Sequence, residues 1–260
     1  MFEPNKEAEV KVVKDIKGRS AVIIDDFYKN PDEVRELAIT AKFTKHPTFP
    51  GIRGVFETTE VREKLFNVFL MLCSNDDIWK NPNSFYYGKK DLENSIEGLR
   101  PFNINIFKHN WDTTEFLVNG LNDITIKRNP HGVIPHQDYW ESDPHEQGCP
   151  IYQFGSVIYL NFPEECAGGT NLWSWNGEMS IPDDYQASWK QDIMKIEGDT
   201  ERYEYLRTKL FDESEPYNCE FEVEMKYNRM LLYQSDVLHS QNVELGMFSK
   251  HQRFNQVFFM

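Results

Sequence analysis

The chain is poor in cysteine and has no long apolar run. Its four cysteines, Cys73, Cys149, Cys166 and Cys219, show no CxxC pair and no regular framework spacing. Free thiols in a reducing compartment are therefore expected. The first six residues contain no apolar signal-peptide core, and no later segment approaches the ~20 apolar residues of a membrane span. These absences predict a soluble, cytoplasmic protein with no membrane partner.

Positive charge is also scarce. The chain has 28 Lys and Arg against 42 Asp and Glu, a formal net charge of -14. Such a charge repels polyanions and disfavours nucleic acid as a partner. The 40% hydrophobic and 14% aromatic content of these 260 residues is enough for a substantial core. We expect a single domain over residues 1–260, and no pattern indicates an oligomeric state.

Residues 1–100 predict an α/β support. Residues 21–24 form a β-branched run typical of a buried strand. Asn30 then offers a helix cap, Pro31 suits the first helical position, and two acids follow in the first turn. A second amphipathic helix is predicted over residues 59–72.

Residues 101–260 show a different pattern of short alternating runs. Strands are predicted at residues 102–107, 124–127, 154–161, 230–233 and 253–259, separated by turn residues, which favours an antiparallel barrel or jelly roll. The segment at about 176–227 is too long for a hairpin loop and is interpreted as a rim insertion and candidate lid, with a helix around residues 199–210. Its acids at residues 197–204 should form a solvated face. An acidic lid would favour a cationic or peptide substrate.

Three residues form a candidate metal site. His136 and Asp138 are two positions apart, and His239 follows a predicted strand. Two imidazoles and one carboxylate, with other positions open, make the facial triad of non-haem Fe(II) enzymes. Taken alone, His136 and Asp138 also fit a surface ion pair, and His239 fits a structural core histidine.

A candidate anion site lies in the last strand. Arg253 and Asn255 share one face of that strand, which places a guanidinium beside an amide. A fixed guanidinium binds a carboxylate in bidentate fashion. Pairing of Arg253 with one of the chain's many acids is the alternative.

The order of these motifs resembles the Fe(II)/2-oxoglutarate-dependent dioxygenase superfamily, and within it the prolyl-hydroxylase-like branch. The resemblance covers about residues 124–260. It rests on an HxD motif, a YLN strand, a GGT hairpin, a D-x-x-H motif and a following basic residue. In this chain these are His136 and Asp138; Tyr159, Leu160 and Asn161; Gly168, Gly169 and Thr170; Asp236 and His239; and Arg253.

The resemblance implies a mainly β (α+β) fold: a double-stranded β-helix, jelly-roll or cupin-like, with N-terminal supporting helices. It implies Fe(II) held by His136, Asp138 and His239, and 2-oxoglutarate bound by Arg253 and Asn255. With O2, such an enzyme hydroxylates a C–H bond and releases succinate and CO2. The acceptor stays open between a peptidyl side chain and a small molecule.

Val133 stands where prolyl hydroxylases often carry a tyrosine, three residues before the first histidine. Asn255 or a tyrosine from a neighbouring strand would then help to hold the cosubstrate. Val133 also permits an alternative, a metal-binding double-stranded β-helix protein without oxygenase turnover. A cupin-like isomerase would need three histidines and an acid, which these spacings do not supply. Because Asp138 occupies the position that a halogenase leaves to halide, halogenation is disfavoured.

Overall fold

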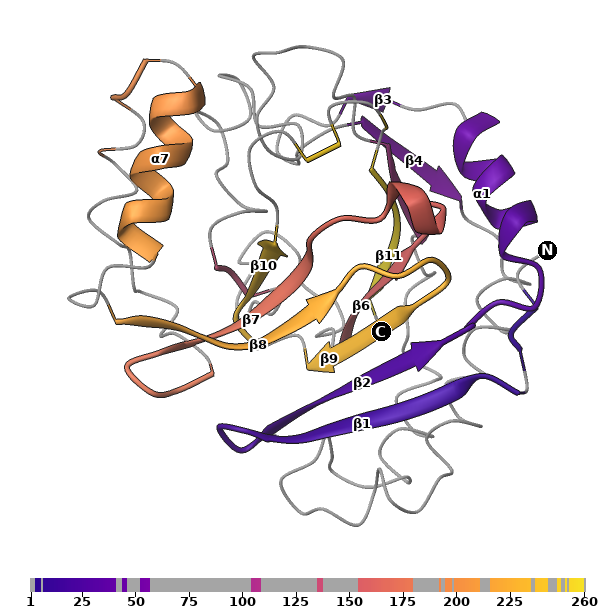
Figure 1. Ribbon diagram of the computed structural model, residues 1–260, viewed down its shortest axis with the longest axis horizontal. Coiled ribbons are helices and arrows are strands. Elements are labelled where there is room, and N and C mark those ends of the chain that lie inside the picture. Colours follow the sequence, from indigo (N-terminus) through magenta and orange to yellow (C-terminus); the bar gives the residue numbers. More distant parts are fainter. Residues whose placement is uncertain are drawn as a thin grey trace, which may run out of the picture.

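In the computed structural model of this chain, the described residues form two antiparallel β-sheets (Figure 1). The structure describes residues 3–5, 7–40, 44–45, 52–56, 104–108, 135–137, 154–179, 192, 195–197, 199–210, 216–234, 237–242, 247–248, 251 and 253–259. The predicted helix at residues 59–72 and the predicted strand at residues 124–127 lie outside these residues.

Among the described residues the large sheet has eight strands. Their order is β1 (Glu9–Ile16), β2 (Arg19–Asp25), β9 (Met230–Gln234), β6 (Phe154–Tyr159), β11 (Phe254–Phe259), β5 (Ile104–Lys108), β4 (Ile52–Phe56) and β3 (Thr44–Lys45). The small sheet has the order β10 (His239–Asn242), β7 (Gly169–Trp175) and β8 (Tyr217–Glu224).

The chain passes back and forth between the two sheets. After β5 and β6 in the large sheet it forms β7 and β8 in the small one, then returns to the large sheet as β9, to the small sheet as β10 and to the large sheet as β11. An isolated antiparallel bridge from His136 to His239 places residue 136 beside β10. Antiparallel strands that alternate between two sheets in this way form a jelly roll. The predicted β-rich, double-stranded β-helix fold is confirmed.

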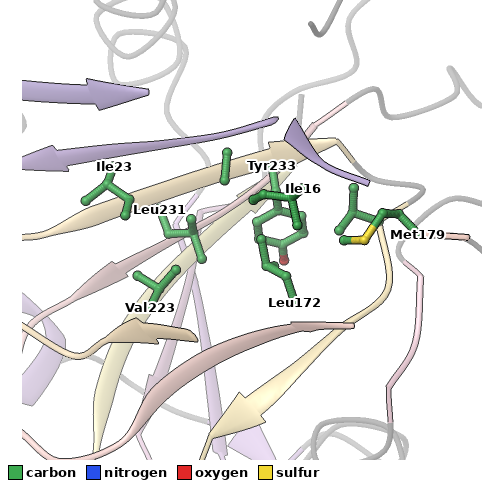
Figure 2. Packing of buried hydrophobic residues seen from close by; sticks show 9 residues of the cluster. Ile16, Ile23, Leu172, Met179, Val223, Leu231 and Tyr233 are labelled. Atoms are coloured by element: carbon green, nitrogen blue, oxygen red, sulfur yellow. The ribbon is translucent and has the colours of Figure 1, made fainter. Parts of the chain in front are cut away.

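The two sheets face each other across an apolar core (Figure 2). Leu231 and Tyr233 of β9 lie opposite Leu172 of β7 and Val223 of β8, and none of the four is more than 1% exposed. Burial of such side chains gives about 25 cal/mol per Å² of apolar surface, so this contact is a main reason why the two sheets stay together.

The N-terminal strands extend the large sheet. β2 pairs with β9 on one side and with β1 on the other. The apolar run at residues 21–24 is buried, as predicted, because the strand packs in the interior of the sheet. The helix α1 (Pro31–Thr40) begins at the predicted proline, with acids in its first turn. Strand β1 was not predicted from the sequence.

The rim insertion is shorter than predicted. The helix α7 (Asp199–Leu210) lies where the sequence placed it, and the acids Glu197, Glu201 and Glu204 are exposed. However, residues 217–224 form β8, which pairs with β7 along its whole length. The predicted end at residue 227 is therefore wrong, and the insertion ends before residue 217. The alternation of apolar and acidic residues in β8 was the signal for a sheet strand with one buried face.

Cys166 and Cys219 are free thiols, as expected, while Cys73 and Cys149 lie outside the described residues. Among the helices that the structure describes, none is long and apolar enough to cross a bilayer.

Candidate metal and carboxylate site

The two candidate histidines lie side by side at the β10 edge of the small sheet. The backbone N–H of His136 donates to the carbonyl of His239 at 3.0 Å, and the N–H of His239 donates to the carbonyl of His136 at 2.9 Å. Their imidazole rings are 4.4 Å apart between centroids. This reciprocal pairing brings together two residues that are about a hundred positions apart in the chain.

The environment of His239 determines which ring nitrogen can bind a metal. Nδ1 lies 3.0 Å from the carbonyl oxygen of Val237. A carbonyl oxygen only accepts, so Nδ1 carries the hydrogen and the lone pair lies on Nε2. The residue is 7% exposed, and the centroid of its ring lies 4.5 Å from that of Tyr233. A carbonyl bonded to the other nitrogen is the usual support of a metal-binding histidine, so His239 fits a metal.

Arg253 is a buried cation with neutral partners. Its residue is 1% exposed. Nη1 donates to Oε1 of Gln241 at 3.1 Å and Nη2 to the carbonyl of Gly169 at 3.4 Å, while the buried Nε has no hydrogen-bond partner in the described part of the chain. Burial lowers the pKa of the guanidinium to about 10. Among the described residues no carboxylate pairs with Arg253, so the predicted alternative of an internal ion pair gains no support there.

Other side chains complete the walls around this guanidinium. The carboxamide of Asn255, oriented with its oxygen toward Arg253, accepts from Nη1 at 2.5 Å. The ring of Tyr159 lies 6.0 Å from the guanidinium carbon, and its hydroxyl is 2.7 Å from Oγ1 of Thr170. Burial raises the pKa of Tyr159, so the phenol keeps its proton and remains a hydrogen-bond donor. The predicted guanidinium beside an amide is present, and a tyrosine from a neighbouring strand stands next to it.

The double glycine allows β7 to approach its neighbours closely. Gly168 has φ +63 and Gly169 has φ +152. A Cβ on Gly168 would lie 1.9 Å from the carbonyl oxygen of Asn242, and one on Gly169 would lie 1.9 Å from that of Val223. The glycines therefore serve the backbone geometry, and Gly169 also presents its carbonyl to Arg253.

Gln241 was missed by the sequence analysis. It follows His239 by two positions in β10, so both side chains lie on the same face of the strand. Through Gln241 the guanidinium of Arg253 is joined to the strand that carries His239. The spacing of two was the available signal, because strand side chains on one face recur at that period.

Several predicted residues lie outside the described part of the chain. These are Asp138, Asp236 and Val133. In the part that the structure describes, no group of three metal-ligating side chains occurs. The structure thus brings His136 and His239 together with each other, and Arg253 together with Asn255. The third ligand, Asp138, stays a prediction.

Comparisons with known proteins give one family and several solved structures. The model of a family of unknown function, DUF6445, matches residues 129–252. No curated protein matches the chain.

Three of the similar structures each cover 92% of this chain. They are a prolyl-4-hydroxylase from Pseudomonas putida (11% identity, 87% of that chain, TM-score 0.38), a collagen prolyl hydroxylase from Paramecium Bursaria Chlorella virus-1 (11%, 87%, 0.39) and HygX from Streptomyces hygroscopicus with nickel and 2-oxoglutarate bound (9%, 81%, 0.38). At these identities and TM-scores, the functional proposal rests on the residues of the site itself.

Proposed function

We propose that this protein is an Fe(II)- and 2-oxoglutarate-dependent dioxygenase. It would hydroxylate a C–H bond of a peptidyl or small-molecule acceptor and release succinate and CO2. His136, Asp138 and His239 would hold the iron, and Arg253 with Asn255 would bind the cosubstrate. The bound metal would supply the coupling of O2 reduction to oxidative decarboxylation of the 2-oxo acid.

The observation that carries the proposal is the buried Arg253. A charged group in the interior is costly unless an opposite charge joins it. Its described partners are neutral, and its Nε has none. An anion from outside the chain would complete the site, and a guanidinium binds a carboxylate best. Because Gln241 joins Arg253 to the strand of His239, a short dicarboxylate could reach from this cation to a metal on the imidazoles.

Each described side chain would have a defined task. His239 presents Nε2 to the metal because Val237 holds Nδ1. Arg253 neutralises the distal carboxylate, and the hydroxyl pair of Tyr159 and Thr170 can add hydrogen bonds to it. The buried rings of Tyr159 and Tyr233 exclude water, which strengthens these electrostatic contacts.

The acceptor and the setting are also proposals. The exposed acids Glu197, Glu201 and Glu204 next to and within α7 support a cationic or peptidyl acceptor, because they would attract positive charge. Neutralising these three acids together should weaken binding of a basic acceptor peptide. Unchanged binding would remove the support. The scattered cysteines support a cytoplasmic location.

The decisive experiment is an anaerobic titration of metal-free protein with Fe(II) and then 2-oxoglutarate. We expect the visible charge-transfer band of a chelated 2-oxo acid. The band should vanish in His136→Ala and weaken in Arg253→Ala. Arg229→Gln is the matched control, because Arg229 pairs with Asp25 at 2.6 Å and has no contact with Arg253 among the described residues.

The absence of a band in wild-type protein that has bound one equivalent of metal would refute the proposal. The chain would then be a metal-binding protein without oxygenase turnover. Succinate release in the presence of O2 separates the same two functions independently.

A further inference from the structure

The strand that carries the candidate cosubstrate residues is clamped at its first residue. Phe254 follows Arg253 directly, and its backbone N–H donates to Oδ1 of Asn161 at 2.7 Å. Its carbonyl accepts from the N–H of Leu160 at 3.0 Å. Both polar backbone groups of Phe254 are therefore held by two consecutive residues after β6. The peptide bond that follows Arg253 cannot rotate without breaking the Asn161 contact.

Asn161 is in turn held by Glu165. Asn161 is fully buried, and its Nδ2 lies 3.4 Å from Oε2 of Glu165. The same carboxylate oxygen accepts from the N–H of Phe162 at 3.1 Å. The amide of Asn161 thus has its oxygen toward β11 and its nitrogen toward an acid, so its orientation is fixed by two different partners.

The acid is anchored from the N-terminal support. Nη2 of Arg35, in α1, lies 3.2 Å from Oε2 and 3.4 Å from Oε1 of Glu165. The guanidinium carbon of Arg35 is 3.8 Å from the ring centroid of Phe162 and 5.4 Å from that of Phe254. The side chains of this ion pair are only 10% and 14% exposed. A pair so well covered is screened little by solvent, unlike a surface ion pair.

We propose that Asn161 is the positioning residue for Arg253, and that Glu165 and Arg35 hold Asn161 in place. The inference deepens the proposed function and rests on it: α1 would act on the cosubstrate site through this chain of contacts. Asn161 does not touch the cosubstrate in this account. It fixes the backbone from which the guanidinium projects, and small errors in such placement are costly because binding depends on a preformed geometry.

The test replaces Asn161 by aspartate. The new side chain keeps an acceptor for Phe254 but puts a second carboxylate beside Glu165. We expect 2-oxoglutarate to bind the Fe(II)-loaded protein about tenfold more weakly, as for the loss of one good buried hydrogen bond. The affinity for Fe(II) should stay as in wild type. Binding of each is measured by anaerobic calorimetry.

A second substitution should reverse the effect. Glu165→Gln in the Asn161→Asp background removes the repulsion and restores a donor to the new carboxylate. Partial recovery of 2-oxoglutarate affinity in the double variant, incomplete because the ion pair between Arg35 and Glu165 is lost, would support the inference, and no recovery would overturn it. If Asn161→Asp does not fold, Glu165→Gln alone is decisive: it loses the carboxylate that pairs with Arg35, and unchanged affinity in that variant would overturn the inference.

Asn228→Asp provides a matched control. Asn228 is also a buried asparagine that clamps one backbone residue: Oδ1 accepts from the N–H of Tyr28 and Nδ2 donates to its carbonyl, both at 2.8 Å. This variant should lose stability to a similar degree, measured by thermal unfolding, and keep wild-type affinity for 2-oxoglutarate. An equal loss of affinity in both variants would mean a general structural effect and overturn the inference.

A measurement on metal-free protein tests the positioning role of Asn161 independently of 2-oxoglutarate binding. The Nε–H of Arg253 can be followed in ¹⁵N-edited NMR spectra and identified by its loss in Arg253→Lys. Asn161→Asp should shift or broaden this signal, and Asn228→Asp should not. If wild type fails to bind 2-oxoglutarate, the proposed function fails. An unchanged Arg253 signal in Asn161→Asp would refute the positioning role in either case.

Discussion

Replacing Arg253 by methionine should stabilise the ligand-free protein and abolish its response to 2-oxoglutarate. The guanidinium is buried, and its described hydrogen-bond acceptors are neutral. Methionine keeps an apolar stem of similar reach and removes the charge. A residue retained for binding at the expense of folding stability is common in functional sites.

The pKa of Arg253 sets the magnitude. Burial lowers this pKa from its ordinary value to about 10. At 1.36 kcal/mol per tenfold change in proton affinity, the buried charge costs the folded state about 3 kcal/mol at neutral pH. For a base with a depressed pKa, this cost is complete below about pH 10 and fades as the pH rises above that value.

In Arg253→Met, lost hydrogen bonds offset part of the stability gained by removing the charge. Gln241, Gly169 and Asn255 each lose a donor. Gln241 is only half-buried and can turn to water, whereas the buried acceptors of Gly169 and Asn255 cost ~1 kcal/mol each. A net stabilisation of about 1 kcal/mol remains, which corresponds to a rise of roughly 2–4 °C in Tm for a chain of this size. Wild type should gain about 2.7 kcal/mol at a 2-oxoglutarate concentration 100 times its Kd, whereas the variant should gain almost nothing.

Differential scanning calorimetry at neutral pH, without ligand and with metal plus 2-oxoglutarate, tests both parts. The melting order should reverse: Arg253→Met above wild type without ligand, and below it with ligand. Arg229→Met is the control, since Arg229 loses its ion pair with Asp25 and should melt below wild type in both conditions. An Arg253→Met protein that melts below wild type without ligand would refute the claim that this charge lacks compensation.

Two further predictions concern stability. Hydrogen bonding to Arg229, with a smaller contribution from Lys226, lowers the pKa of Asp25 from 3.8 to about 2. This shift corresponds to about 2 kcal/mol of folding stability, which is present above pH 4 and is lost as the pH falls toward 2. In Asp25→Asn, the free energy of unfolding measured with urea should therefore fall less steeply than in wild type as the pH is lowered from 4 to 2. An equal pH dependence in the two proteins would contradict this. Gly169→Ala should lower the free energy of unfolding by more than ~3 kcal/mol, because the new Cβ would lie 1.9 Å from the carbonyl oxygen of Val223. Gly18→Ala, at φ +77 with nothing within 4 Å, should lose only about 1–2 kcal/mol from backbone strain. Equal losses at the two glycines in chemical denaturation would show that the close approach at Gly169 is relieved by small shifts.

Local patterns predicted much of the secondary structure. The buried run of β2, the proline-started helix α1 and the helix α7 were recognisable because each pattern depends on neighbours within a few residues. Strand β8 was misassigned to the insertion, since residues 176–227 were interpreted as one unit from their length and from the helix at residues 199–210. Its pairing with β7 is a contact across more than forty residues, which no local pattern encodes.

The candidate site was predictable in its chemistry and only partly in its composition. His136, His239 and Arg253 were found from residue type and motif order, and their roles stay predictions until the titration is done. Gln241, Thr170 and the hydroxyl of Tyr159 were not assigned to the site, because glutamine, threonine and tyrosine are common and their role depends on which residues lie next to them in space.

The sequence by itself determined a β-rich chain, the identity of the candidate ligands and the strand face shared by Arg253 and Asn255. These features follow from residue chemistry and from the period of two along a strand. Only the tertiary structure decided that Val237 fixes the tautomer of His239, that the described hydrogen-bond partners of the buried Arg253 are neutral, and that Asn161 clamps Phe254. Each of these depends on the order and register of strands from distant parts of the chain, and the free energy that selects them comes from packing the whole core.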